Sequence, residues 1–117
     1  MKIFILIDQL HTHGGIEKLV AEKANYWSDV FGFEVKIIST EQENKPYVYK
    51  LSEKVAFQDL AVNYHRGISF FHPKNLGKLT KNFFQIQKLI KQEQPEVILV
   101  ASHIPMTYLL PLMKTKA

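Results

Sequence analysis

The sequence predicts an α/β domain of the Rossmann-like class, with a doubly wound, mostly parallel sheet. Two observations carry this prediction. Strand-like apolar runs alternate with amphipathic, helix-like segments along the 117 residues, which is the element order typical of a parallel sheet. The runs at residues 3–7 and 96–101 are almost unbroken in apolar character, and such runs indicate strands that are covered on both faces.

The composition is that of one globular domain, with 46% apolar and 22% charged residues. Cysteine is absent from the sequence, which excludes a disulfide framework and a thiolate metal site. The formal charge of +4 is mild, and the sequence contains no long run of lysine and arginine, so we expect no nucleic-acid partner. The first apolar run is too short for a signal peptide, and we expect a cytoplasmic location.

The first half of the chain predicts a strand–helix–strand unit. The strand at residues 3–7 runs into the polar loop 8–13, and the pair Gly14-Gly15 then opens a helix. Gly32 is expected to end that helix and a second strand to occupy residues 33–40. Apolar residues recur at helical spacing between the two strands: Ile16, Leu19, Val20, Ala24, Trp27, Val30 and Phe31.

The second half predicts two further strands, a short edge strand and two helices. Residues 47–49 suit a short edge strand, 55–60 a third strand and 76–94 an amphipathic helix that Pro95 terminates. The apolar side of that helix is expected to be Leu76, Leu79, Phe83, Ile86 and Ile90. A buried strand at 96–101, a polar turn at 102–105 and a last helix from 106 complete the pattern.

The expected strand order is 3-2-1-4, which places the turns after the first and last strands side by side. Ligands of doubly wound sheets bind outside the carboxyl ends of the strands, where the strand order reverses. The turn at Gly14-Gly15 suits an anion, because glycines allow close approach and a helix start presents free N–H groups. Since the pattern stops within its last helix, we interpret residues 1–117 as a single domain cut from a larger protein.

Three motifs resemble the N-terminal domain of the large retaining glycosyltransferase family four, of the two-domain GT-B type. The run 14–18, Gly-Gly-Ile-Glu-Lys, is similar to that family's Gly-Gly-x-Glu-Arg/Lys turn. The run 32–35, Gly-Phe-Glu-Val, is similar to its Gly-His-Glu-Val entry into the second strand. Pro95-Glu96-Val97-Ile98 precedes a strand that ends at a histidine, His103.

The resemblance implies transfer of a sugar from a nucleotide-sugar donor to a saccharide or lipid-linked acceptor, as in bacterial polysaccharide or glycolipid assembly. It implies that this domain serves the acceptor side and that its glycine turn lies against the donor diphosphate. The fifth strand and the C-terminal donor domain are absent, so this chain alone is expected to be inactive, with no catalytic residue assigned and no cofactor. The candidate substrate-binding residues are Gly14, Gly15, His13 and His103, followed by Asp8, Thr12 and Glu17.

Simpler interpretations stay open for each of these residues. The glycines also suit a turn with no ligand, Glu17 suits a carboxylate that favours a helix start, and the histidines suit loop positions. No Gly-x-Gly-x-x-Gly, Gly-Lys-Ser/Thr or His-x3-His pattern is present, so neither a dinucleotide site, a P-loop nor a metal site is expected. A non-catalytic flavodoxin-like or receiver-like module is the alternative function, which the lack of acidic partners for Asp8 and Asp59 disfavours.

Four lysines of the predicted helix 76–94 and its start lie on one side: Lys74, Lys78, Lys81 and Lys88. Such a stripe is usually a solvated face. The alternative is contact with an anionic membrane surface that carries a lipid-linked acceptor, where each lysine contributes about 1 kcal/mol. This alternative places the protein peripherally at the inner membrane face.

Overall fold

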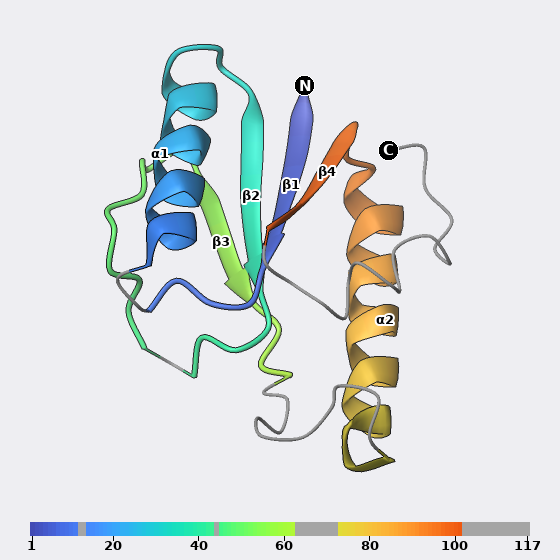
Figure 1. The fold of residues 1–117 in the computed structure, drawn as a ribbon. Helices are drawn as coiled ribbons and strands as arrows, with labels where there is room; N and C mark the ends of the chain where they lie inside the picture. The colour runs from blue at the N-terminus through green and yellow to red at the C-terminus, as the bar shows by residue number, and fades with distance from the viewer. Residues whose placement is uncertain (12–13, 44, 63–72, 102–117) are drawn as a thin grey trace.

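The structure, a computed structural model, describes residues 1–11, 14–43, 45–62 and 73–101 of the chain (Figure 1). Strands and helices alternate as the sequence predicts. The elements are β1 (Lys2–Ile7), α1 (Gly15–Asp29), β2 (Glu34–Ser39), β3 (Ala56–Asp59), α2 (Pro73–Glu93) and β4 (Val97–Ala101).

The sheet has the predicted order β3-β2-β1-β4, and every pair of neighbouring strands is parallel. Strand β1 is central, because Ile5 pairs with Ile37 of β2 on one side and with Leu99 of β4 on the other. The strand order therefore reverses between β1 and β4, and the Rossmann-like α/β class is confirmed.

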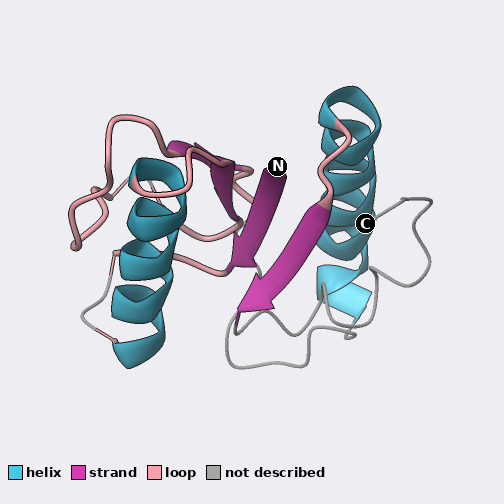
Figure 2. Cartoon of the chain, turned by 90° about the horizontal axis from the view of Figure 1, so that it is seen from above, coloured by secondary structure: helices cyan, strands magenta, loops and turns pink. Residues whose placement is uncertain are grey.

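Helices α1 and α2 cover opposite faces of this sheet (Figure 2). Side chains alternate along β1, so that Ile5 and its odd-numbered neighbours pack under α1. Phe4 and Leu6 point the other way and pack against Ile86 and Ile90 of α2. The central strand is thus buried on both faces, which explains its unbroken apolar sequence.

The inner face of α1 consists of small side chains. Val20, Ala21 and Ala24 are buried against the sheet, and the short side chains let the helix axis lie close to the strands. The predicted end of the helix is confirmed, since Gly32 has a φ of +69° and the N–H of Phe33 returns to the carbonyl of Trp27 at 3.1 Å.

The expected apolar sides of both helices are partly wrong. Ile16, Leu19, Val30 and Phe31 are exposed on α1, because the helix is apolar over a wider arc than the one face that meets the sheet. On α2, Leu76 is exposed, while two polar residues of the same helix are fully buried: Asn75 and Asn82.

Two strand predictions also need correction. Residues 47–49 do not form a strand, and the N–H of Val48 instead donates to the carbonyl of Leu10 at 2.9 Å. Strand β4 is the edge of the described sheet, so Val97 and Leu99 are exposed on its α1 face.

Neither helix of the described part combines the length and the apolar character that crossing a membrane requires.

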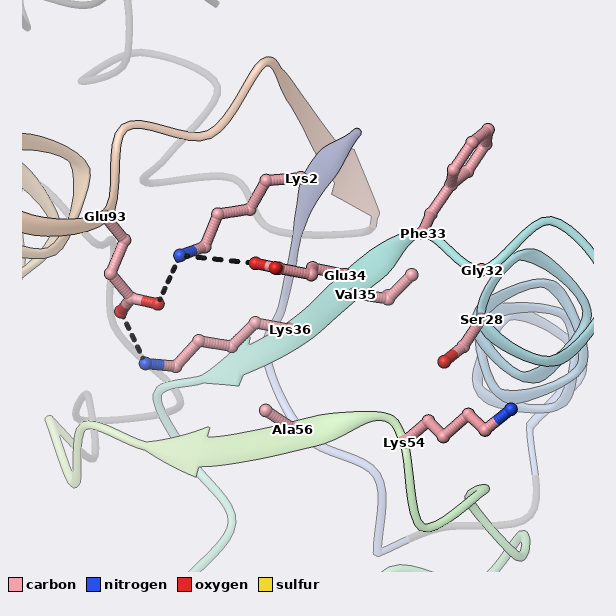
Figure 3. A pocket seen from close by; sticks show the side chains of 10 residues that line it. All are labelled: Lys2, Ser28, Gly32, Phe33, Glu34, Val35, Lys36, Lys54, Ala56 and Glu93. Carbon is pink, nitrogen blue, oxygen red and sulfur yellow. Dashed lines mark hydrogen bonds and ion pairs between the residues drawn. The ribbon is translucent and has the colours of Figure 1, made fainter.

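A charged cluster fastens the end of α2 to the amino ends of β1 and β2 (Figure 3). Lys36 donates a hydrogen bond to Glu93 Oε2 at 2.7 Å, and Lys2 Nζ lies 3.4 Å from Glu93 Oε1. Lys2 also reaches the more exposed Glu34 at 3.7 Å. Burial raises the pKa of Glu93, but the hydrogen bonds and charges of Lys36 and Lys2 outweigh this effect and hold the pKa below its ordinary value of 4.5.

The depressed pKa of Glu93 predicts an acid-dependent loss of stability. The stabilisation is present above the unfolded pKa and disappears as the pH falls through the lower folded pKa. Replacement Glu93→Gln should lower the free energy of unfolding by about 1 kcal/mol at pH 7, and the two proteins should converge at acidic pH, once the pH has fallen below the lowered folded-state pKa of Glu93. Urea denaturation between pH 3 and 7 measures this difference, and a gap that stays constant with pH would contradict the assignment.

Candidate functional site

The candidate site lies at the carboxyl edge of the sheet, where the described strands all end because they are parallel (Figure 1). Strand β1 continues into the polar loop that begins at Asp8, and α1 starts at the same edge after Gly14. Strand β3 ends there at Asp59, and β4 ends at Ala101. This edge therefore gathers polar segments that are far apart in the sequence.

Glu17 folds back onto the glycine turn at the start of α1. A Cβ atom added to Gly14 would occupy the space of the Glu17 carboxylate, whereas nothing described lies within 4 Å of the corresponding position on Gly15. Gly14 is the N-cap and is extended, with a φ of −98°, so its lack of a side chain matters for space and not for backbone strain. The positive end of the helix is thus already next to a carboxylate of the same chain.

Gln9 connects the end of β1 with this carboxylate. Its backbone N–H donates to Asp8 Oδ1 at 2.8 Å, and its side-chain Nε2 donates to Glu17 Oε1 at 3.3 Å. The Gln9 Oε1 atom accepts the N–H of His11 at 2.8 Å. One buried amide therefore orders the loop around both predicted acidic residues.

A second buried amide, that of Gln42, holds the loop after β1 against the loop after β2. The Oε1 atom of Gln42 accepts the N–H of Leu10 at 2.8 Å, and its Nε2 donates to the carbonyl of Lys45 at 2.8 Å. Backbone bonds reinforce the junction, since the carbonyl of Asp8 accepts the N–H of Glu41 at 2.8 Å and of Thr40 at 3.2 Å. Hydrogen bonds between the two loops therefore form a continuous polar layer at this edge.

Asp59 extends this layer to β3. Its Oδ1 accepts the hydroxyl of Ser39 at 2.9 Å and the N–H of Gln42 at 3.3 Å. On the other side of the loop, His11 Nε2 lies 3.4 Å from Glu43 Oε2. These contacts join the loops after β1 and β2 to the end of β3.

The structure brings together four of the seven predicted site residues, all on the β1–α1 turn. Asp8 directly follows β1, Gly14 and Gly15 open α1, and the carboxylate of Glu17 lies over Gly14. Their role toward a substrate stays a prediction. Three other predicted residues lie outside the described residues: Thr12, His13 and His103.

Sequence reasoning missed Gln9 and Gln42 and did not connect Asp59 with the turn. Gln9 carried a usable signal, since it is polar and lies two residues beyond a buried strand. Gln42 and Asp59 carried none, because their partners are 32 and 17 residues away in the chain and a polar residue in a loop ordinarily faces water.

The amino edge of the sheet contains a cavity of about 490 Å³ (Figure 3). Two lysines and two glutamates that line it form ion pairs with one another, so their charges compensate: Lys2, Lys36, Glu34 and Glu93. Ligands of doubly wound sheets bind at the opposite edge. We therefore place the candidate site at the carboxyl edge.

No protein-family model matches this chain, and no curated protein matches it either. Within the described ranges, no group of three or more histidine, cysteine, aspartate or glutamate side chains is placed to share a metal ion.

The contact between Gly14 and Glu17 predicts a coupled pair of mutational effects. Replacement Gly14→Ala should lower the free energy of unfolding by about 1 kcal/mol, because alanine is a poorer N-cap and displaces the carboxylate. The loss should be clearly smaller in a Glu17→Ala background, where no carboxylate remains to be displaced. Gly15→Ala, with open space at its Cβ, serves as the matched control and should be neutral or stabilising. Equal losses in the two backgrounds would refute the contact.

Proposed function

We propose that this chain is the N-terminal, acceptor-side domain of a retaining GT-B glycosyltransferase of family four. The whole enzyme moves a sugar from a nucleotide-sugar donor to a saccharide or lipid-linked acceptor, in polysaccharide or glycolipid assembly, and this domain alone is inactive. The observation that carries the proposal is the position of the Gly14-Gly15 turn. It starts a helix directly after the central strand, next to the point where the strand order reverses, and its sequence is that of the family's turn.

The strand order favours this proposal over a flavodoxin-like or receiver-like module. Flavodoxin-like sheets have the order 2-1-3-4-5, in which β1 lies between β2 and β3. Here β2 lies between β1 and β3, and β1 has β4 as its other neighbour. This is the first half of the dinucleotide-binding arrangement 3-2-1-4-5-6.

The turn supplies hydrogen-bond donors for a diphosphate. The first bond within α1 runs from the N–H of Lys18 to the carbonyl of Gly14 at 3.1 Å. The N–H groups of the residues from Gly15 to Glu17 precede it, and in a helix these groups have no helical acceptor. Together with the helix dipole they stabilise negative charge that develops on a leaving diphosphate.

Glu17 has a specific place in this proposal. Its carboxylate lies over Gly14 in the structure, where it repels an incoming phosphate and competes for the same donors. A diphosphate therefore binds with Glu17 turned outward, which breaks the hydrogen bond from Gln9. His13 and His103 complete the proposed substrate contacts from the two turns that follow β1 and β4.

Titration of the ¹⁵N-labelled chain with inorganic pyrophosphate tests the turn directly. The expected result is a saturable shift of the amide signals of residues 15–18 at millimolar concentration, with tighter binding by Glu17→Ala. Glu22→Ala is the matched control, because Glu22 is an exposed carboxylate further along the same helix and should leave the affinity unchanged. Unmoved signals at residues 15–18, or equal affinities of the two variants, would contradict the proposal.

The lysines of α2 are proposed to serve a membrane-bound acceptor. Lys74, Lys81 and Lys88 are exposed and Lys78 is half-buried. Flotation with vesicles containing anionic lipid should carry the chain upward at low salt and release it at high salt, since the attraction is electrostatic. The double variant Lys81→Gln/Lys88→Gln should float less than Lys50→Gln, which removes a lysine from another part of the surface. Absence of flotation at low salt would refute this contact.

A further inference from the structure

Helix α1 carries a second apolar stripe, which faces away from the sheet. Its large residues are Ile16, Leu19, Tyr26 and Val30, whose relative exposures are 47%, 51%, 54% and 59%. With Lys23 they follow a spacing of three and four residues, which is the seam pattern of a helix that packs on another helix. We call these five residues the α1 seam.

The α1 seam is separate from the face that packs on the sheet. At 100° per residue, its members lie within an arc of about 80°, and the middle of that arc is well over 100° from the centre of the buried face. The buried face uses small side chains such as Ala21 and Ala24, while the seam uses large ones. Large apolar side chains on an exposed helix face are typical of an interaction site.

The middle of the seam is hollowed. A depression of about 380 Å³ is lined by Leu19, Glu22, Lys23 and Tyr26, with Trp27 at its side. Residues i, i+3, i+4 and i+7 of one helix form the hole that receives a side chain of a partner helix, and these four have that spacing. Tyr26 is held in place beside it by edge-to-face contact with Phe31, at a centroid distance of 5.3 Å.

We propose that this depression and the α1 seam pair with the same helix of a second copy, in an antiparallel arrangement about a two-fold axis. An axis between positions 22 and 23 places Leu19 opposite the partner's Tyr26 and Glu22 opposite the partner's Lys23. Because the contact is isologous, each of these pairs occurs twice. In this arrangement, apolar residues of one copy contact apolar residues of the other, and each charged residue faces one of opposite charge.

Charge complementarity is what favours a second copy as the occupant. In the single chain, Glu22 lies 4.0 Å from Lys18 in an exposed pair, and Lys23 Nζ lies 5.9 Å from the centre of the Trp27 ring. Pairing gives Lys23 a carboxylate partner beside that ring. Burial of a lysine in the middle of an apolar seam is costly when it has no partner of opposite charge. Registers that do not place Lys23 opposite a carboxylate are therefore disfavoured, so this ion pair also specifies the register of the two helices.

The expected dimer is weak. A helix of 15 residues is about 22 Å long, so one helix pair buries less than a standard interface does. The corresponding dissociation constant lies between about 1 µM and 1 mM. The association does not depend on the proposed glycosyltransferase function.

Sedimentation velocity of the whole chain from 5 µM to 1 mM tests the proposal. The sedimentation coefficient should rise with concentration from that of a monomer toward that of a dimer. Leu19→Glu should abolish the rise, whereas Phe84→Glu, which changes an exposed aromatic residue of α2, should preserve it. A monomer throughout the range, or a dimer that Leu19→Glu leaves intact, would overturn the proposal.

Charge exchange tests the register. Glu22→Lys and Lys23→Glu should each weaken the dimer at least tenfold, because each places two like charges opposite one another twice. The double variant Glu22→Lys/Lys23→Glu restores both pairs with reversed polarity and should recover dimerisation at low salt. Failure of the double variant to recover, while circular dichroism shows that it is folded, would exclude the antiparallel register.

Discussion

The structure depends on the burial of β1 on both faces and both sides. Its backbone hydrogen-bonds β2 and β4, and its alternate side chains form the centres of the two hydrophobic cores. Phe4, Ile5 and Ile7 have no exposed area, and each contributes about 2 kcal/mol through removal of apolar surface from water. Because β1 fixes the positions of β2, β4 and both helices, it also fixes where the turn that follows it lies.

The carboxyl edge shows how a polar layer is kept stable next to such a core. Five buried polar residues lie there, and they are Gln9, Ser39, Thr40, Glu41 and Gln42. Burial of polar groups is costly without hydrogen bonds. The amide of Gln42 meets this need by joining the loops after β1 and β2, and the amide of Gln9 does so within the turn between β1 and α1. The loops are therefore held in one arrangement, which is what a binding turn requires.

Helix α1 has two different apolar faces, one that packs on the sheet and one that is exposed. Its small residues allow close packing on the sheet, while its large apolar residues remain outside. One end of the same helix presents the glycine turn, and the other ends at Asp29, shortly before Gly32 with its positive φ. The helix thus links the proposed diphosphate contact with the proposed self-association surface, and Ile16 belongs to both, with its backbone N–H in the first and its side chain in the second.

Local patterns in the sequence determined the elements and their order in the sheet. An unbroken apolar run, a helical period or a glycine at a helix end each reflects the conformational preference of a few neighbouring residues. The sequence was therefore enough to predict β1, α1, the position of Gly32 and the strand order 3-2-1-4. The tertiary structure decided the rest: which arc of α1 is buried, that Asn75 is buried and Leu76 exposed, that Asp59 and Gln42 meet, and that Glu17 lies over Gly14. These outcomes depend on contacts between distant segments and on the space left between them, and no local pattern encodes either.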